Sequence, residues 1–338
     1  MKARVPGDCS IEPTVNWMIK QIVREAFLRL PRKKHHEWIS LLGLTEALTK
    51  SRCKHSEEKP LVDLNEDKTD EEFKKECLDN LDAITERISG QLGKLCEVME
   101  QIGAFELREI IKLIKIREFQ NLTPLPAHYY IAFLAQETLV NEVITTNYDC
   151  CLEKAVHYCV GNHSAKQPNS SKAVSIYDLK SYRDKGARRL FPYNMAAVLR
   201  VYKINGCATQ LISDPNHTAS ILITERQLQH MNNRMWAKDL LRDRARSRSL
   251  VFSGFGSEEP QVRFTVLRLL EEFLKSDSVP DEPNNALWMQ IYDNERSFAQ
   301  NQIMYGFWRN NSNPSDKIEE LTFSKKDVPE LNKYLGIN

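Results

Sequence analysis

The chain has 338 residues, which is long enough to bury one large hydrophobic core or two ordinary ones. Its 47 lysines and arginines nearly balance its 46 aspartates and glutamates, so it lacks the overall basic charge typical of proteins that bind nucleic acids or membrane surfaces. No uncharged apolar run approaches the ~20 residues that a membrane-spanning helix requires. We therefore expect a globular protein that neither crosses a membrane nor binds nucleic acid.

Eight cysteines are spread along the chain without a Cys-x-x-Cys pair. A structural zinc site usually takes its ligands from two such close pairs, so no metal and no zinc are predicted. Cys150 and Cys151 are adjacent, which argues against a framework of disulfides, and no secretion signal is recognisable. These features favour a reducing, cytoplasmic environment.

Helical periodicity dominates the first 120 residues. Apolar residues recur at helical spacing over residues 15–30, and Pro31 ends this stripe. The pattern stays mainly helical as far as Glu118, with interruptions by a charged loop and by glycines. We predict a first βα element in residues 1–30, followed by a helical insertion in residues 31–120.

Short apolar strands alternate with helices from residue 121 onward, a pattern typical of a mostly parallel sheet. The predicted strands are 142–146, 173–177, 196–204, 220–223, 249–253 and 286–292. The predicted helices are 128–140, 149–160, 224–243, 259–275 and 294–304. This alternation predicts an α/β, Rossmann-like fold, with helices on both faces of a mostly parallel sheet. Residues 121–308 would form its core, and residues 309–338 a C-terminal tail with a strand from Glu319.

The chemically most informative segment runs from Val143 to Asp149. Apolar residues lead into the polar turn Thr-Thr-Asn-Tyr-Asp at residues 145–149, and a helical pattern follows. In α/β proteins, such a turn carries side chains to the carboxyl end of a strand, where ligands bind. The segment resembles the signature of the sirtuin-like (silent information regulator-like) family, whose members bind NAD and cleave the bond between its nicotinamide and ribose.

The resemblance implies roles for three polar residues of this turn. Asn147 would hold the ribose hydroxyl and the attacking water, and its amide suits both because it donates and accepts hydrogen bonds. Asp149 would bind the nicotinamide carboxamide, whose NH2 group needs an acceptor. Thr146 would line the NAD site beside them. The simpler alternative is an ordinary strand-to-helix turn, in which Asn147 or Asp149 caps the helix.

A second segment, Lys-Ile-Asn-Gly-Cys at residues 203–207, resembles the family's Lys-Leu-His-Gly-Ser. The histidine of that motif is the family's general base, and Asn205 stands in its place. An asparagine cannot accept a proton, and losing a general base typically costs ~10²–10⁴ in rate. Asn205 is therefore a site residue only by its position in the motif. His157, His163 or His217 could act as the general base instead only if the fold brings one of them near this site.

Two glycine-containing segments complete the resemblance. Near the N-terminus, Gly7 and Ser10 correspond to the family's Gly-Ala-Gly-x-Ser loop, in which glycines let the backbone approach the NAD pyrophosphate. Pro6 and Asp8 depart from that loop. A later strand is followed by a second loop, whose implied NAD contacts are Gly254, Phe255, Gly256 and Ser257. Each segment read by itself is also typical of the start of a helix.

Several other distinctive residues have structural interpretations. The basic run at residues 242–248 is typical of a solvated helix end, where cations are favourable, and the alternative is a contact with a nucleic acid or an acidic partner. The His35-His36 pair lies among charged residues and is predicted to be at the surface. Trp17, Trp38 and Trp236 fall among apolar helical positions and are predicted to be in the core.

Two functions of different classes follow from the resemblance. The absence of a four-cysteine zinc module separates the chain from the protein deacylases and favours the bacterial defence-type branch, whose members hydrolyse NAD to ADP-ribose and nicotinamide. Members of that branch often act as homo-oligomers or with a partner ATPase or nuclease. The alternative is a catalytically silent nucleotide-binding or scaffold module that assembles with a partner protein. The intact pair of Asn147 and Asp149 favours the hydrolase, whereas Asn205 favours the silent module.

Overall fold

The structure is a computed structural model, and it describes residues 14–49, 61–62, 69–161, 173–186, 199–213, 218–230, 234–247, 251–252, 262, 265, 287–292 and 319–324. The chain divides into two compact units, Met1–Gln227 and Leu228–Asn338. The predicted NAD contacts Gly7, Ser10, Gly254, Phe255, Gly256 and Ser257 lie outside the described residues.

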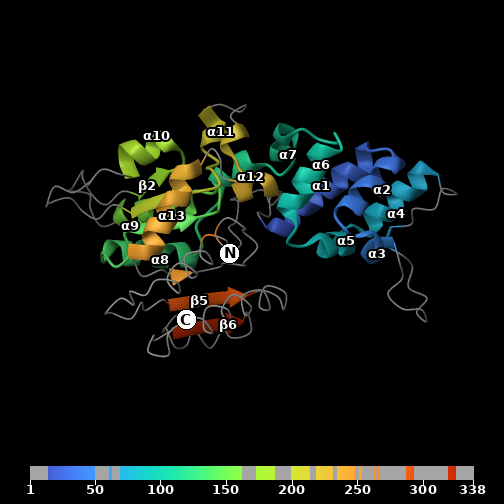
Figure 1. The fold of residues 1–338 in the computed structure, drawn as a ribbon. Coiled ribbons are helices and arrows are strands. Elements are labelled where there is room, and N and C mark those ends of the chain that lie inside the picture. The colour runs from blue at the N-terminus through green and yellow to red at the C-terminus, as the bar shows by residue number, and fades with distance from the viewer. Residues whose placement is uncertain are drawn as a thin grey trace, which may run out of the picture. The chain divides into compact units, whose positions relative to one another are not determined.

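The first unit begins with a group of helices (Figure 1). They are α1 (Val15–Arg29), α2 (Arg32–Leu41), α3 (Thr45–Thr49), α4 (Asp70–Asp79), α5 (Leu81–Ile88), α6 (Leu92–Gln101), α7 (Leu107–Leu113) and the 3-10 helix η1 (Ile116–Asn121). Their apolar faces meet in one core, as the sequence predicts for a helical segment at residues 31–120.

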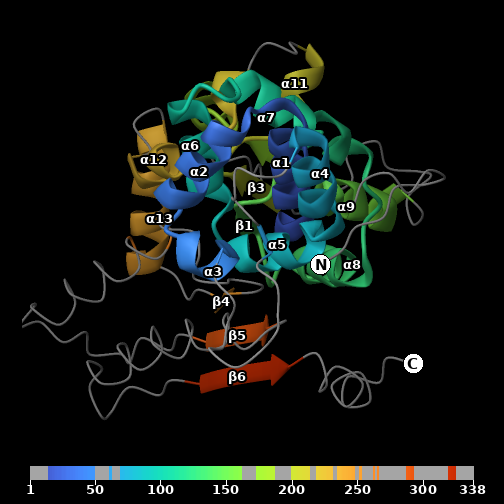
Figure 2. The same cartoon turned by 90° about the vertical axis from the view of Figure 1, so that its right-hand side faces the viewer.

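Helix α1 shows how the sequence specifies these elements. The side chain of Thr14 accepts a hydrogen bond of 3.1 Å from the Trp17 N–H and so caps the first turn. The apolar stripe predicted at residues 15–30 is buried, and its members are Met18, Ile19, Ile22, Val23, Ala26 and Phe27. Helices α4 and α5 pack against α1 (Figure 2).

The prediction that His35 lies at the surface was wrong. Its side chain is fully buried, and its Nδ1 accepts a 3.1 Å hydrogen bond from the indole N–H of Trp38. The ring of Phe27 lies 5.0 Å from the imidazole, centroid to centroid. The spacing of His35, Trp38 and Ile39 places all three on one face of α2, so helical periodicity outweighs the charged neighbours in sequence. Trp38 is in the core as predicted.

A small parallel sheet follows the helices and confirms the predicted α/β, Rossmann-like class. Strands β1 (Glu142–Thr145), β3 (Leu199–Lys203) and β2 (Ala173–Ile176) are hydrogen-bonded in that spatial order. Thr145 pairs with Lys203, and Ile176 pairs with Tyr202. Because both pairings are parallel, the three carboxyl ends lie at one edge of the sheet, which we name the carboxyl edge.

Side chains alternate between the two faces of the central strand β3. Leu199 and Val201 pack under α8 (Pro126–Gln136) and α9 (Cys151–Gly161), which lie side by side (Figure 1). Tyr202 points to the other face, where its ring lies 6.4 Å from that of Tyr182 in the π-helical turn η2 (Tyr182–Gly186). Both faces of the central strand are therefore covered by other elements.

Two predicted elements in residues 220–243 differ from the structure. Residues 221–223 are buried but form an irregular segment, not the strand predicted at 220–223. The helix predicted at 224–243 is represented by two helices, α12 (Glu225–His230) and α13 (Met235–Ser247). The side-chain oxygen of Gln227 accepts hydrogen bonds from the backbone N–H groups of Ile223 and Thr224, at 3.0 and 3.1 Å. A side chain therefore satisfies this backbone instead of a neighbouring strand.

The second unit contains α13 and a parallel sheet in the order β4 (Val251–Phe252), β5 (Leu287–Tyr292), β6 (Glu319–Ser324). These strands agree with the predictions at 249–253, at 286–292 and after Glu319. Trp236 is buried as expected.

The remaining short helices are α10 (Leu179–Ser181), α11 (Gln210–Ser213) and the 3-10 helix η3 (Thr218–Ser220). Within the described residues, every helix is too short or too polar to cross a membrane.

Candidate functional site

The carboxyl edge brings together the three predicted site residues of the turn after β1. Thr146 and Asp149 are half-buried, whereas the side chain of Asn147 is exposed. The backbone N–H of Asn147 donates a 3.1 Å hydrogen bond to the hydroxyl of Thr145, which fixes the turn while leaving the Asn147 amide directed to solvent. A ligand at this edge can therefore reach the Asn147 side chain directly.

Asp149 caps the helix that follows. Its Oδ1 accepts a 2.9 Å hydrogen bond from the backbone N–H of Cys151, the first residue of α9. The capping alternative is thus correct for Asp149. It does not exclude a ligand, because an ionised carboxylate offers about four acceptor positions and the cap uses one of them.

The turn that carries Asn205 is tied to the turn that carries Asn147. The backbone N–H of Leu222 donates to the carbonyl of Asn205 at 2.9 Å, and the hydroxyl of Tyr148 donates to the carbonyl of Leu222 at 2.7 Å. The N–H of Ala208 also donates to the carbonyl of Tyr148 at 2.9 Å. Asn205 itself is only 5% exposed. Two segments that are distant in sequence are therefore hydrogen-bonded to each other at this edge, with Asn147 exposed on one and Asn205 buried on the other.

Gly206 permits the approach of these segments. Its φ is +113°, a conformation that residues with a Cβ rarely adopt, and a Cβ there would collide with the carbonyl oxygen of Ser220 and lie 2.9 Å from the Cδ1 of Ile221.

We expect Gly206→Ala to lower the free energy of unfolding by at least about 2 kcal/mol, because strain and a backbone collision combine. Gly43→Ala is the matched control, since Gly43 has φ +74° but no atom within 4 Å of the added Cβ. Urea unfolding of both variants measures the difference. Equal losses in the two variants would contradict the close approach at Gly206.

A buried lysine, which the sequence analysis did not select, supports the carboxyl edge from beneath. Lys203, the last residue of β3, is 2% exposed and donates a hydrogen bond to the backbone carbonyl of Asp149. Its Nζ also lies 3.3 Å from Oε1 of Glu153 on α9, and Ser175 on β2 donates to the same carboxylate oxygen. Burial by itself lowers the pKa of Lys203, but Glu153 and the nearby Cys207 and Cys150 raise it above its ordinary value. A charged lysine therefore joins β1, β2, β3 and α9. The sequence signal for it is its place as the lysine of the Lys-Ile-Asn-Gly-Cys segment at residues 203–207.

His128 on α8 lies near Asp149, and the sequence analysis did not consider it. Its Nδ1 accepts a 2.9 Å hydrogen bond from the Leu125 N–H, so the neutral ring carries its proton on Nε2, as assigned from this bond. Burial lowers the pKa of His128, although the Asp149 carboxylate opposes this. The neutral ring thus has no free nitrogen to act as a base.

His157 is exposed and lies six residues after Cys151, about 9 Å along α9 from the site. His163 and His217 lie outside the described residues.

His128, Asp149 and Cys151 offer one potential metal ligand each, and these atoms lie within 4.8 Å of one another. All three groups already take part in hydrogen bonds near the starts of α8 and α9. Those of His128 and Asp149 are given above, and the Cys151 thiol donates to the carbonyl of Leu122 at 3.8 Å. Burial also raises the pKa of the Cys151 thiol, which disfavours the thiolate that a metal requires. We interpret the group as helix capping and keep the prediction that the site holds no zinc.

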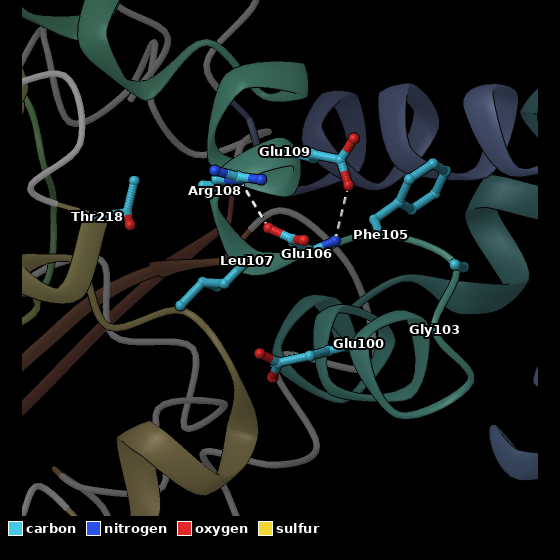
Figure 3. A pocket seen from close by; sticks show the side chains of 9 residues that line it. Glu100, Gly103, Phe105, Glu106, Leu107, Arg108, Glu109 and Thr218 are labelled. Atoms are coloured by element: carbon cyan, nitrogen blue, oxygen red, sulfur yellow. Dashed lines mark hydrogen bonds and ion pairs between the residues drawn. The ribbon is translucent and has the colours of Figure 1, made fainter.

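A cavity of about 590 Å³ lies beside α6 and α7, and Thr218 of η3 also lines it (Figure 3). Three carboxylates line it, those of Glu100, Glu106 and Glu109. The backbone N–H of Glu106 donates to Glu109 at 2.9 Å, and the Glu106 carboxylate pairs with Arg108 at 2.6 Å. A carboxylate-rich wall repels the NAD diphosphate, so we do not assign NAD to this cavity.

Comparison with known families identifies the region that contains the carboxyl edge. Residues 141–305 match the model of the SIR2-like domain. The chain contains a SIR2-like domain. The match begins one residue before β1 and includes Thr146, Asn147, Asp149 and Asn205, so the domain contains both turns of the site. No curated protein matches the chain.

SIR2-like domains bind NAD, and the described residues of this one fit such a ligand. The exposed Asn147 amide can donate to and accept from ribose hydroxyls, and the uncapped positions of the Asp149 carboxylate can accept from an amide NH2. The match to the SIR2-like domain indicates an NAD-related function.

Proposed function

We propose that this SIR2-like protein hydrolyses NAD to ADP-ribose and nicotinamide at the carboxyl edge of its sheet. The observation that carries the proposal is the exposed Asn147 amide, which lies two residues before a half-buried carboxylate, on a turn hydrogen-bonded to the one that carries Asn205. A polar pair on a turn held by such contacts is suited to bind a ligand without reorganisation.

The proposed reaction replaces one bond at the ribose anomeric carbon by another. The glycosidic bond breaks with both electrons passing to the nicotinamide nitrogen, so nicotinamide leaves uncharged, while a water oxygen bonds to the same carbon. Asn147 holds the ribose hydroxyl and the incoming water. Asp149 accepts a hydrogen bond from the carboxamide NH2, and its charge stabilises the positive charge that develops on the ribose.

The water must lose a proton, and the described residues near Asn205 offer no neutral histidine nitrogen to take it. We therefore propose that the proton passes to solvent. The expected rate is ~10²–10⁴ lower than with a positioned base, which makes this a slow hydrolase when it acts alone.

A catalytically silent nucleotide-binding or scaffold module is the second candidate. It is favoured by the position of Asn205, which is 5% exposed and bears a side chain that cannot take up a proton. Such a module keeps the NAD contacts of Asn147 and Asp149 but releases no nicotinamide.

The two candidates differ in one assay. Purified protein is incubated with NAD, alone and with the protein encoded beside it, and nicotinamide is measured by liquid chromatography while NAD binding is measured by calorimetry. Release of nicotinamide supports the hydrolase. Binding without release under both conditions supports the silent module, and the absence of binding would exclude both candidates.

We further propose that the activity belongs to bacterial antiphage defence in the cytoplasm, where the chain acts as a homo-oligomer or with a partner ATPase or nuclease. Controlled depletion of NAD suits such a role because one enzyme can arrest the metabolism of an infected cell. Size measurement of the purified protein, with and without the neighbouring gene product, tests the assembly.

A further inference from the structure

Two thiols from different strand ends face each other at the carboxyl edge. Cys150 follows the turn after β1, Cys207 follows β3, and their Sγ atoms are 3.7 Å apart. Cys207 is fully buried, whereas Cys150 is half-buried and gives the pair its access to solvent. Both are free thiols. A shift of the two turns by less than 2 Å would bring the sulfurs to the ~2.05 Å of a disulfide.

The surroundings of Cys207 favour a thiolate. A hydrogen bond from Cys150 lowers the pKa of Cys207 to about 6, opposed by burial and assisted by the Lys203 ammonium. The hydroxyl of Thr209 lies 3.1 Å from the sulfur and assists further. The same bond between the sulfurs, together with burial, raises the pKa of Cys150. The opposite shifts of the two pKa values favour a pair that holds one proton, with the negative charge on Cys207.

The charged and titratable groups around the pair come from each neighbouring element. Lys203 belongs to β3, Asp149 to the turn after β1, Glu153 to α9, and Tyr177 to the end of β2. Lys203 is the cation among these four. Its single positive charge is shared between the Glu153 carboxylate and the Cys207 sulfur, and it favours the thiolate against the cost of burial.

We propose that Cys150 and Cys207 form a reversible disulfide when the protein meets hydrogen peroxide, so that the carboxyl edge is a redox-sensitive site. The Cys207 thiolate attacks one peroxide oxygen, the O–O bond breaks, and a sulfenic acid and hydroxide are produced. The Cys150 sulfur then attacks the Cys207 sulfur, and the sulfenic hydroxyl leaves as water with the proton of Cys150. The sulfurs lose two electrons, which reduce the peroxide.

The neighbouring Cys151 provides a matched control, since it adjoins Cys150 in sequence but points elsewhere. Its thiol donates to the carbonyl of Leu122 and is fully buried in the helical core. Adjacent residues of the same type therefore differ in whether they face Cys207, and Cys151 is also the more deeply buried of the two.

The test treats folded protein with limited hydrogen peroxide near pH 7, blocks remaining thiols after unfolding, and maps peptides by mass spectrometry without reduction. We expect a link between Cys150 and Cys207 in the wild type and in Cys151→Ser, reversed by dithiothreitol. Cys150→Ser should lose the link and accumulate a sulfenic acid on Cys207, trapped by dimedone. Free thiols at both positions in oxidant-treated wild type, or a disulfide that joins Cys207 to Cys151 instead of Cys150, would overturn the proposal.

A pH series on the wild type alone provides a second measurement that does not depend on any variant folding. A thiolate that forms near pH 6 predicts a rate of disulfide formation that rises about tenfold from pH 5 to pH 7 and little above. An ordinary thiol, with a pKa of ~8.5, predicts a rise that continues to pH 9. The second profile would overturn the assignment of Cys207 as the attacking group. The readout is a covalent bond, so neither result depends on whether the protein hydrolyses NAD.

Discussion

Asn147→Ala is expected to lower the rate of nicotinamide release by ~10²–10³, the loss typical when one positioned polar group is removed from a site where charge develops. The side chain is exposed and its turn is held by backbone and Thr145 contacts, so the free energy of unfolding should change by less than ~0.5 kcal/mol. Single-turnover assays with saturating enzyme measure the chemical step directly.

Asn141→Ala is the matched control for this variant. Asn141 is an exposed asparagine at the opposite end of β1, and its role in the sheet is carried by its backbone carbonyl, which accepts from Arg200. We expect Asn141→Ala to release nicotinamide at the wild-type rate. Wild-type turnover by Asn147→Ala would exclude the carboxyl edge as the place where the glycosidic bond breaks.

Lys203→Met should lower the free energy of unfolding by about 3–5 kcal/mol, because breaking a buried ion pair leaves its partner uncompensated. The Glu153 carboxylate is 15% exposed, and its Oε2 already lacks a hydrogen-bond partner among the described residues. The variant also removes the hydrogen bond that Lys203 donates to the carbonyl of Asp149. Urea unfolding monitored by circular dichroism gives the change.

Two further variants separate the buried charge from loss of packing. Lys203→Met combined with Glu153→Gln should recover part of the loss, because the carboxylate no longer lacks its cation. Lys180→Met removes an exposed lysine and should change the unfolding free energy by less than ~0.5 kcal/mol. A double variant that is no more stable than Lys203→Met would contradict the ion-pair explanation.

Local patterns predicted most of the elements that position the site. The polar turn at residues 145–149 does end a parallel strand and start a helix, and residues 15–30 do form a helix with a buried stripe. These predictions succeeded because helical and strand spacing is set by neighbours within a few residues. The resemblance that rests on the turn is confirmed for the SIR2-like domain. The roles of Asn147, Asp149 and Asn205 stay predictions.

The predictions that failed concern residues whose partners belong to other elements of the structure. The apolar residues 221–223 have the composition of a strand, but their backbone is satisfied by Asn205 and by the Gln227 side chain. His35 stands among charged residues, yet its stripe on α2 packs against Phe27 of α1. Local composition does not specify which surface an element will bury.

The sequence by itself determined where the strands end and which polar residues follow them, because both depend on short-range spacing and turn chemistry. The tertiary structure alone decided what lies beneath those residues. Lys203 meets Glu153, and Cys150 meets Cys207 at a separation of 57 positions, through the parallel pairing of β1 with β3. Shifting that register by one residue would turn Lys203 to the opposite face of the sheet and separate these groups. The polar residues of the Asn147 turn are thus evident from the sequence, whereas the ion pair of Lys203 with Glu153 and the facing thiols of Cys150 and Cys207 depend on the fold.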